Sequence, residues 1–364
     1  MLDLAGVNQV LASVIDPNTG QDFVASRGVR NVRLEGPDGA VRVSLDVELG
    51  YPAASQFELI RQLITQALQK AGAAEVRAAV TSKIVAHTVQ RGVKVMPNVR
   101  NIVAVASGKG GVGKSTVAVN LALALAAEGA RVGMLDADIY GPSQPTMLGI
   151  SGRPESEDGK TMEPLENYGI QANSIGLLVD QDTPMVWRGP MVTSALQQLL
   201  TQTNWKDLDY LVVDMPPGTG DIQLTLAQQV PVTGAVIVTT PQDIALLDAM
   251  KGLKMFEKVG VPILGIVENM AVHVCSQCGH AEHVFGTGGG QKMAQQYGVE
   301  VLGSLPLDIR IREQTDSGRP TVVAEPDGAI ATLYKAIARR IAIKIAERAK
   351  DLSAKMPAIK VSKT

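Results

Sequence analysis

The amino-acid sequence predicts an α/β protein, with a doubly wound, mostly parallel sheet preceded by a small α+β domain. From residue 101 onward, short aliphatic runs alternate with helix-like segments, the pattern of successive βαβ units. Aromatic residues make up only 3% of the 364 residues, so the core must be mostly Val, Ile, Leu and Ala, which suits strands buried on both faces. Before residue 93 the pattern differs, because one segment alternates strictly between apolar and polar residues.

Residues 1–92 are predicted to form the small α+β domain. The alternating segment, 41–49, places Val and Leu on one face of a strand and polar residues on the other. Residues 55–58, Ser-Gln-Phe-Glu, have the pattern of a capping box and predict that a helix starts there. The remaining elements are a helix at 7–14 and strands at 29–34 and 75–80.

The predicted parallel sheet occupies residues 101–349, after a linker at 93–100 and before a basic C-terminal tail at 350–364. Right-handed crossovers place ligand-binding groups at the carboxyl ends of the strands in such a sheet, and the informative residues fall there. The strands are expected at 102–106, 132–136, 170–175, 210–214, 235–240 and 263–267.

The bulk composition argues against several classes of protein. The formal net charge is −2, which gives no reason to expect nucleic-acid binding. No apolar stretch reaches the roughly 18 residues that a bilayer requires, and the N-terminus lacks the basic start and apolar core of a signal peptide. We therefore expect a cytoplasmic protein without stable membrane association.

The most specific motif follows the predicted strand at 102–106. Residues 108–115 match the phosphate-binding P-loop pattern G-x-x-x-x-G-K-[ST], and a helix-like run comes next. The glycines allow successive N–H groups to converge on phosphates, Lys114 is expected against the β- and γ-phosphates, and the Ser115 hydroxyl is expected to ligate Mg²⁺. The sequence thus predicts an ATP site, with nucleotide-binding residues Gly108, Lys109, Gly110, Gly111, Val112, Gly113, Lys114, Ser115 and Thr116.

Three aspartates end predicted strands of the same sheet. Asp136 and Asp138 follow one strand, and either could position the water that attacks the γ-phosphate or a magnesium-bound water. Asp214 ends an apolar run, as a Walker-B carboxylate does, and the loop at 215–221 is suited to sensing the γ-phosphate. The alternative is that these aspartates only cap helices. The functional interpretation predicts an ATPase, with catalytic residues Lys109, Lys114, Asp136, Asp138 and Asp214.

The only two cysteines, Cys275 and Cys278, form one Cys-x-x-Cys pair, with three histidines close in sequence. Thiolates are soft ligands that suit zinc, copper(I) or an iron–sulfur cluster. A cluster usually takes four cysteines, so two copies of the chain across a two-fold axis would supply the full set. Three alternatives stay open: a zinc site that adds His280, His283 or a second subunit, a redox pair, and an inert pair.

Several ordered segments resemble the Mrp (ApbC-type) family of iron–sulfur cluster carriers, whose ATPase domain has a deviant Walker A loop with an additional lysine. The matching segments are residues 108–116, 136–143, 187–191, 213–221, 240–243 and 268–270. Residues 1–92 resemble the small iron–sulfur assembly domain that is often fused ahead of these ATPases.

The resemblance implies a homodimer that hydrolyses ATP slowly. It implies that Cys275 and Cys278 of each subunit bind a shared cluster, expected to be 4Fe-4S, which is delivered to apo iron–sulfur proteins. It also implies that Lys109 reaches the partner subunit's nucleotide and that Asn269 lies near the adenine. Some relatives of the small domain carry a cysteine near the position of residues 51–53, but this sequence has none there, which excludes a second cluster-handling thiol in that domain.

Membrane- or chromosome-positioning ATPases share the deviant P-loop and are the main alternative, with structural zinc at the cysteine pair. Such proteins often end in an amphipathic helix, and the sequence predicts one near its C-terminus. We expect this helix instead to dock on the sheet, because a doubly wound sheet needs covering helices on both faces. Its apolar residues are Ile330, Leu333, Tyr334, Ile337, Ile341 and Ile345.

Overall fold

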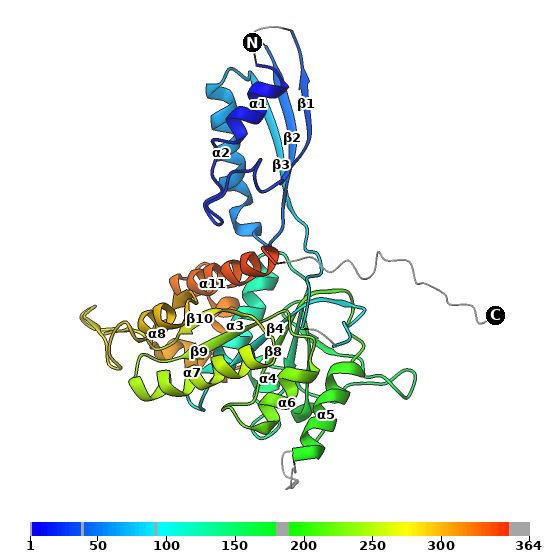
Figure 1. Ribbon diagram of the computed structural model, residues 1–364, viewed down its shortest axis with the longest axis vertical. Helices are drawn as coiled ribbons and strands as arrows, with labels where there is room; N and C mark the ends of the chain where they lie inside the picture. Colours follow the sequence, from blue (N-terminus) through cyan, green and yellow to red (C-terminus); the bar gives the residue numbers. More distant parts are fainter. Residues whose placement is uncertain (1, 38–39, 91–92, 180–188, 349–364) are drawn as a thin grey trace, which may run out of the picture.

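The computed structural model describes residues 2–37, 40–90, 93–179 and 189–348. The predicted tail at 350–364 lies outside these residues, as do Trp187 and Arg188 of the matching segment at 187–191. The chain forms a small domain that stands on a larger α/β domain (Figure 1). The predicted combination of a small α+β unit and a mostly parallel sheet is confirmed.

The small domain is a three-stranded sheet with two helices on one face (Figure 1). The strand order is β1-β2-β3, with β1 antiparallel and β3 parallel to the central β2. The predicted alternation of β2 is confirmed, because its Val and Leu side chains are buried against the helices while its polar residues are more exposed. The elements are α1 (Leu4–Leu11), β1 (Val29–Glu35), β2 (Arg42–Leu49), a 3₁₀ turn η1 (Ala54–Gln56), α2 (Phe57–Lys70) and β3 (Glu75–Ser82).

The predicted capping box at residues 55–58 is wrong. Helix α2 begins at Phe57 with no side-chain cap, and the Ser55 hydroxyl donates instead to Oε1 of Glu128 in the larger domain, at 2.7 Å. The Ser55 N–H donates to the other carboxylate oxygen of Glu128, at 3.0 Å. A hydrogen bond from this hydroxyl to a buried carboxylate is stronger than the capping hydrogen bond that the hydroxyl would accept from a backbone N–H. A contact between the domains therefore replaces the local cap.

The larger domain contains an eight-stranded sheet, parallel throughout except for the edge strand β6. The strand order is β13-β10-β9-β4-β8-β5-β7-β6. All six predicted strands are present within a few residues of their expected bounds, but the short edge strands β6 and β13 were not predicted. The strands are β4 (Val99–Ala106), β5 (Val132–Asp136), β6 (Leu165–Asn167), β7 (Ile170–Ser174), β8 (Leu208–Asp214), β9 (Gly234–Thr239), β10 (Ile263–Glu268) and β13 (Val301–Ser304).

Helices cover both faces of this sheet and form two buried clusters (Figure 1). Alternate residues of β4 show the division, since Val103 and Val105 face the cluster containing α3 and α11, whereas Ala104 and Ala106 face the other. The helices over one face are α3 (Lys114–Ala127) and α11 (Ala329–Ala346), with the shorter α4 (Gln144–Met147), α9 (Ile309–Asp316) and α10 (Thr321–Ala324). Those over the other face are α5 (Gly189–Thr201), α6 (Asp221–Gln229), α7 (Asp243–Lys258) and α8 (Gly289–Tyr297).

The predicted C-terminal amphipathic helix is α11, and it docks on the sheet as expected. Its apolar residues are buried against α3, with the exception of Leu333, which is 41% exposed. The helix therefore presents no continuous apolar face for a membrane surface. None of the helices in the described residues is long and apolar enough to cross a bilayer.

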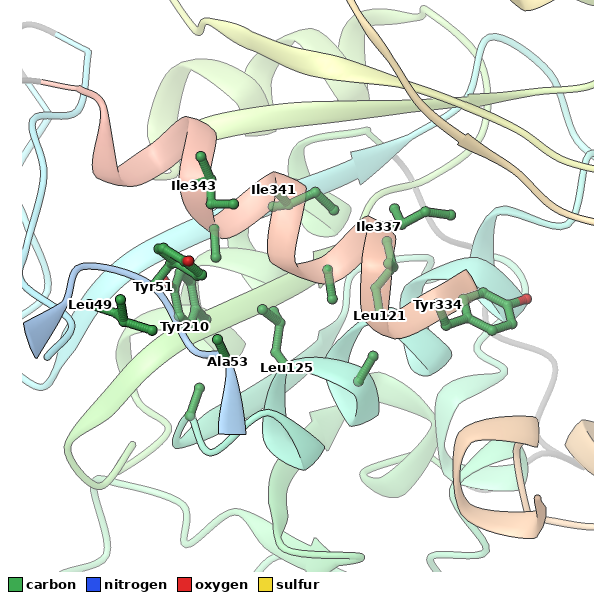
Figure 2. Close-up of a cluster of buried hydrophobic side chains, with 14 of the residues drawn as sticks. Leu49, Tyr51, Ala53, Leu121, Leu125, Tyr210, Tyr334, Ile337, Ile341 and Ile343 are labelled. Atoms are coloured by element: carbon green, nitrogen blue, oxygen red, sulfur yellow. The ribbon is translucent and has the colours of Figure 1, made fainter. Parts of the chain in front are cut away.

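The two domains share one continuous buried cluster (Figure 2). Leu49, Tyr51 and Ala53 of the small domain belong to it together with Leu125 of α3 and Ile341 of α11. Glu128 is fully buried at this junction and pairs with Arg339 of α11 as well as with Ser55. Apolar burial and a buried ion pair therefore hold the small domain against the far end of α3 from the P-loop.

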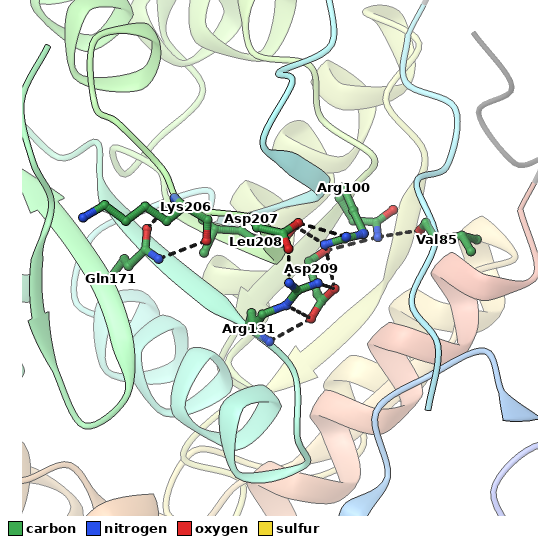
Figure 3. A network of polar contacts seen from close by, with 9 residues as sticks. Val85, Arg100, Arg131, Gln171, Lys206, Asp207, Leu208 and Asp209 are labelled. Atoms are coloured by element: carbon green, nitrogen blue, oxygen red, sulfur yellow. Dashed lines mark hydrogen bonds and ion pairs between the residues drawn. The ribbon is translucent and has the colours of Figure 1, made fainter. Parts of the chain in front are cut away.

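Ion pairs between arginines and aspartates connect the amino ends of the central strands (Figure 3). Asp209 accepts from Arg131 at 3.0 Å and from Arg100 at 3.0 Å, and Asp207 pairs with both arginines. The chain between the domains passes this edge, because Asn101 donates to the carbonyl of Val85 at 3.0 Å. The predicted linker at 93–100 needs one correction, since β4 already begins at Val99 and includes Arg100.

Candidate functional site

The P-loop lies between β4 and α3, at the carboxyl edge of the parallel sheet. Gly111 and Gly113 adopt positive φ angles of 81° and 80°, a conformation that other L-residues rarely adopt. A Cβ at Gly108 would lie 2.0 Å from the carbonyl oxygen of Asp248, so only glycine allows the loop to pass this close to α7. The loop leads directly into the N-terminus of α3, where free N–H groups and the helix dipole favour phosphate.

Lys114 and Asp214 meet in the centre of the site. Lys114 is 6% exposed, and its Nζ pairs with Oδ1 of the fully buried Asp214 and lies 3.1 Å from Oγ of Ser115. The predicted phosphate-binding lysine, magnesium-binding hydroxyl and Walker-B carboxylate are therefore brought into contact. Such a lysine can move to a phosphate oxygen when a nucleotide enters, which frees the Asp214 carboxylate.

The two neighbouring aspartates after β5 have different surroundings. Asp136 is fully buried, and its carboxylate accepts from the N–H groups of Asp138, Ser143 and Gln144 at 2.9–3.1 Å and from the Ser174 hydroxyl at 3.1 Å. Burial and then the charge of Asp214, its register partner on β8, raise the pKa of Asp136 to about 7. With four donors on its two oxygens, Asp136 is suited to holding the loop after β5 in place.

Asp138 is the more accessible of the two aspartates, at 9% exposed. Burial raises its pKa, while the Lys114 ammonium opposes this shift and the charge of Asp214 adds to it. Its carboxylate therefore lies within electrostatic reach of the lysine and the Walker-B position. The geometry favours Asp138, which sequence spacing alone could not distinguish from Asp136, as the carboxylate that positions water.

The loop after Asp214 runs beside the P-loop. The N–H of Met215 donates to the carbonyl of Val105 at 3.0 Å, and the N–H of Gly218 donates to the carbonyl of Ser107 at 3.0 Å. Gly218 has a φ of 100°, which allows the loop to turn back at this point. A segment held by one hydrogen bond to the end of β4 and by another to the start of the P-loop is well placed to respond to the γ-phosphate.

Asn269 contacts the P-loop from the end of β10. Its Nδ2 donates to the carbonyl of Val112 at 2.9 Å, and a Cβ at Gly113 would lie 2.3 Å from the same nitrogen. Asn269 therefore supports the shape of the loop, a role that the sequence analysis did not predict for it.

Sequence reasoning missed Gln144, which is 1% exposed. Its Nε2 donates to Oδ2 of Asp214 at 2.8 Å and to the carbonyl of Ser115 at 3.1 Å. Within the described residues, Oε1 of Gln144 and Oγ of Ser143 are buried without a hydrogen-bond partner. The unpaired oxygen of Gln144 therefore belongs to a side chain that contacts Ser115 and Asp214, two residues of the predicted nucleotide site. The only sequence signal was its position directly after the matching segment at 136–143.

The cysteine pair lies in a separate extension of the same sheet edge, which we call the cysteine hairpin, residues 271–288. It follows β10 and contains the two-residue strands β11 (His273–Val274) and β12 (Ala281–Glu282). Cys275 and Cys278 occupy the turn between these strands. The N–H of Cys275 donates to the carbonyl of His280 at 2.9 Å, and the N–H of Gly279 donates to the carbonyl of Cys275 at 2.9 Å. Cys278 is exposed and Cys275 is half-buried.

This turn aims backbone donors at a thiol. N–H groups of Cys278 and Gln277 point at the sulfur of Cys275 and lower its pKa, which favours the thiolate that ligates metals. Among the residues that the structure describes, no group of three or more His, Cys, Asp or Glu side chains could hold a metal ion. The alternative of a zinc site that adds His280 or His283 of the same chain is therefore not formed in the part of the chain that the structure describes. The cysteine pair offers two ligands from one chain.

Comparison with known proteins identifies the larger domain. Residues 98–342 match the family model described as NUBPL iron-transfer P-loop NTPase. The chain belongs to this family. Residues 4–81 of this iron-transfer P-loop NTPase match a second family model, described as iron-sulfur cluster assembly protein. Both matches agree with the two domains of the fold.

Relatives of this NUBPL-type NTPase cover from about two thirds to nearly all of the chain. The iron-sulfur cluster carrier protein of Haemophilus influenzae is 52% identical over 343 residues, which cover 93% of this chain and 91% of the relative. The protein of the same description from Pseudomonas fragi is 64% identical over 269 residues, or 73% of this chain and 94% of the relative. A solved structure, the nucleotide-binding protein in complex with ADP from Archaeoglobus fulgidus, is 37% identical with a TM-score of 0.56 and covers 64% of this chain and 90% of that chain.

Proposed function

We propose that this NTPase is an ATP-hydrolysing carrier of iron–sulfur clusters that works as a homodimer. The observation that carries the proposal is the cysteine hairpin, which presents two thiols of one chain on the same sheet edge as the P-loop. A cluster usually needs four thiolates, so two subunits that face each other across this edge supply them. The relatives named as cluster carriers, and the family of iron-transfer NTPases, support this assignment.

In this proposal, ATP with magnesium is the substrate of the P-loop, and the cluster, expected to be 4Fe-4S, is the cargo of the thiols. Lys114 binds the β- and γ-phosphates, Ser115 ligates magnesium, and Asp138 orients the attacking water. Lys109, half-buried in the loop, reaches across the dimer to the partner's nucleotide, and Asn269 lies near the adenine. The recipients are apo iron–sulfur proteins, and the reduced thiols suit a cytoplasmic location.

The positioning ATPases are not supported as an alternative. Their membrane-binding version requires an exposed amphipathic helix, whereas α11 buries its apolar residues against α3. A positioning function also gives no role to a pair of thiols that the hairpin holds at its turn. We therefore propose the carrier alone.

Anaerobic reconstitution with iron and sulfide tests the proposal. The wild type should take up about four irons per dimer, and the Cys275→Ala/Cys278→Ala variant should take up none. Lys114→Ala is the matched control, because it should lose ATP hydrolysis while its thiols still load. If the wild type held zinc tightly and refused iron, the carrier function would be given up and the ATPase retained.

A further inference from the structure

The matching tripeptide Glu268-Asn269-Met270 contacts both candidate sites. We propose that it is the joint through which nucleotide at the P-loop changes the exposure of the cysteine hairpin, and that Glu268 is the positioning residue that fixes the root of the hairpin. This inference rests on the proposed function, since it concerns how the thiols of the carrier respond to nucleotide. The sequence identified the segment only as a match to the carrier family.

One side of the joint is the P-loop. Asn269 holds the carbonyl of Val112 at 2.9 Å, and its own N–H is fixed to the carbonyl of Thr239 at 2.7 Å. Because a peptide unit is planar and trans, a Val112 carbonyl drawn toward Asn269 aims the following N–H of Gly113 in the opposite direction, away from Asn269. N–H groups of a P-loop are the donors that phosphates bind. A phosphate that binds the N–H of Gly113 therefore contacts the same peptide unit whose carbonyl is hydrogen-bonded to Asn269.

Met270 turns the chain at this point. Its φ is 57°, in the left-handed region that a non-glycine residue rarely adopts. A Cβ on Gly113 would lie 3.7 Å from the Met270 side chain, so this strained residue also packs beside the P-loop. Backbone strain of this kind persists where the surroundings hold it in place, and here the chain begins the cysteine hairpin directly afterwards.

The other side of the joint is the carboxylate of Glu268, which is 7% exposed. One oxygen accepts from the N–H of Gly290 at 2.7 Å and the other from the Ser304 hydroxyl at 3.3 Å. Gly290 lies in the first turn of α8, at the point to which the chain returns after the cysteines. Glu268 therefore closes the root of the hairpin, and the positive end of α8 favours its charge.

Further contacts make the root stiff. The N–H of Ala271 donates to the carbonyl of Leu305 at 2.9 Å, and the N–H of Leu307 donates to the carbonyl of Val272 at 2.8 Å. Nδ1 of His283 lies 2.8 Å from the carbonyl oxygen of Ala271. The hairpin itself contains only two-residue strands, which cannot fix its orientation alone. The position of the thiols is therefore set at the root, where Glu268 and Asn269 are adjacent.

Alkylation of Cys278 tests this joint without any cluster. The rate of reaction with iodoacetamide is measured by mass spectrometry on the reduced full-length protein, with ADP or with a non-hydrolysable ATP analogue and magnesium. We expect the wild-type rate to differ by about fivefold between the two nucleotides. Glu268→Ala should react faster with both and lose the difference, while its nucleotide affinity stays within about twofold of the wild type.

Three further variants make the result specific. Glu268→Gln can still accept from Gly290 and should keep the nucleotide response. Glu282→Gln removes an exposed carboxylate from the same hairpin and should behave as the wild type. If Glu268→Ala does not fold, Gly290→Ala replaces it, because the added Cβ would lie 3.1 Å from the Glu268 carboxylate, which must shift by a few tenths of an ångström and so weakens the same contact.

The inference is overturned if Glu268→Ala, or Gly290→Ala in its place, keeps the wild-type response, or if the wild type binds both nucleotides without any change in alkylation rate.

The assay contains no iron, sulfide or recipient protein. A nucleotide-dependent thiol in a protein that loads no cluster would therefore contradict the carrier function and leave the joint intact. A carrier that loads and delivers its cluster with no nucleotide response would contradict the joint alone.

Discussion

Asp136 and Asp138 show how strongly a buried site separates neighbouring residues of the same type. Both carboxylate oxygens of Asp136 accept hydrogen bonds, from backbone N–H groups and from the Ser174 hydroxyl. Asp138 lies within the electrostatic influence of Lys114 and Asp214 and keeps some exposure. The first residue is therefore expected to contribute to stability and the second to hydrolysis.

Asp138→Asn should reduce the kcat for ATP hydrolysis by about a hundredfold or more, because the amide cannot orient the attacking water as a carboxylate does. The affinity for ADP should change by less than about threefold, since the P-loop itself is untouched. Steady-state hydrolysis and ADP titration measure the two quantities. Asp327→Asn, at an exposed site, is the control, and a normal kcat in Asp138→Asn would remove Asp138 from the catalytic residues.

The raised pKa of Asp136 predicts a pH-dependent stability. An aspartate that ionises near pH 4 in the unfolded chain but at about 7 in the folded protein favours folding while it is protonated. This contribution is present at low pH and is lost as the pH rises through about 7. Asp136→Asn cannot ionise, so from about pH 5 to about pH 8 the free energy of unfolding of the wild type should fall relative to the variant by roughly 2 kcal/mol.

Urea unfolding of the nucleotide-free protein at several pH values measures this difference. The variant also loses an acceptor for backbone N–H groups, which lowers its stability by a similar amount at every pH and does not affect the slope. A difference between wild type and variant that stays constant from acid to alkaline pH would show that Asp136 is already ionised throughout this range.

At the scale of elements, the junction at the end of α3 joins the two domains. Glu128 follows α3 and is fully buried, with partners from η1 of the small domain and from α11. Glu128→Ala leaves Arg339, whose side chain is only 12% exposed, without its carboxylate and should lower the free energy of unfolding by about 3 kcal/mol. Because the lost contacts connect the domains, the small domain should also unfold in a separate, earlier transition.

Calorimetry and limited proteolysis between residues 83 and 90 measure this separation. Lys335→Ala is a suitable control, because the hydrogen bond of this partly exposed cation of α11 goes to the carbonyl of Pro326, at 2.8 Å. One unchanged, cooperative transition in Glu128→Ala would mean that the apolar contacts alone couple the domains.

The sequence predicted those elements whose signals are local. Strand β5 was predicted with its observed bounds, because four buried apolar or small residues followed by Asp136 leave little choice. Strands β6 and β13 have three and four residues, too short to show a period, and lie at the sheet edges. Ser55 was misassigned because its partner, Glu128, lies 73 residues away. For the same reason Gln144 and Glu268 had no recognisable role until folding brought their partners to them.

At the scale of the whole molecule, the small domain and the cysteine pair lie in different parts of the structure. The small domain docks at the end of α3 that is remote from the P-loop, and all cysteines of the chain lie in the cysteine hairpin of the other domain. A helix of 14 residues spans about 21 Å, so the length of α3 separates the docked small domain from the P-loop. We expect the small domain to act in docking or regulation rather than in ligating the cluster.

A cluster shared by two subunits predicts how mixed dimers load. When equal amounts of wild type and Cys275→Ala/Cys278→Ala exchange subunits before reconstitution, about one quarter of the dimers contain four thiolates. Iron uptake should then be about one quarter of that of the pure wild type. Uptake of one half would indicate that each chain binds its own metal, and the shared site would be wrong.

Transfer of the loaded cluster to a recipient tests the carrier function most directly. The reconstituted wild type is mixed anaerobically with an apo four-iron dehydratase in the presence of excess ferrous chelator, and the recovery of dehydratase activity is followed. The account predicts that activity rises in proportion to the cluster supplied while the chelator takes up little iron. If the chelator captures the iron and the recipient stays inactive, the protein binds a cluster but does not carry it.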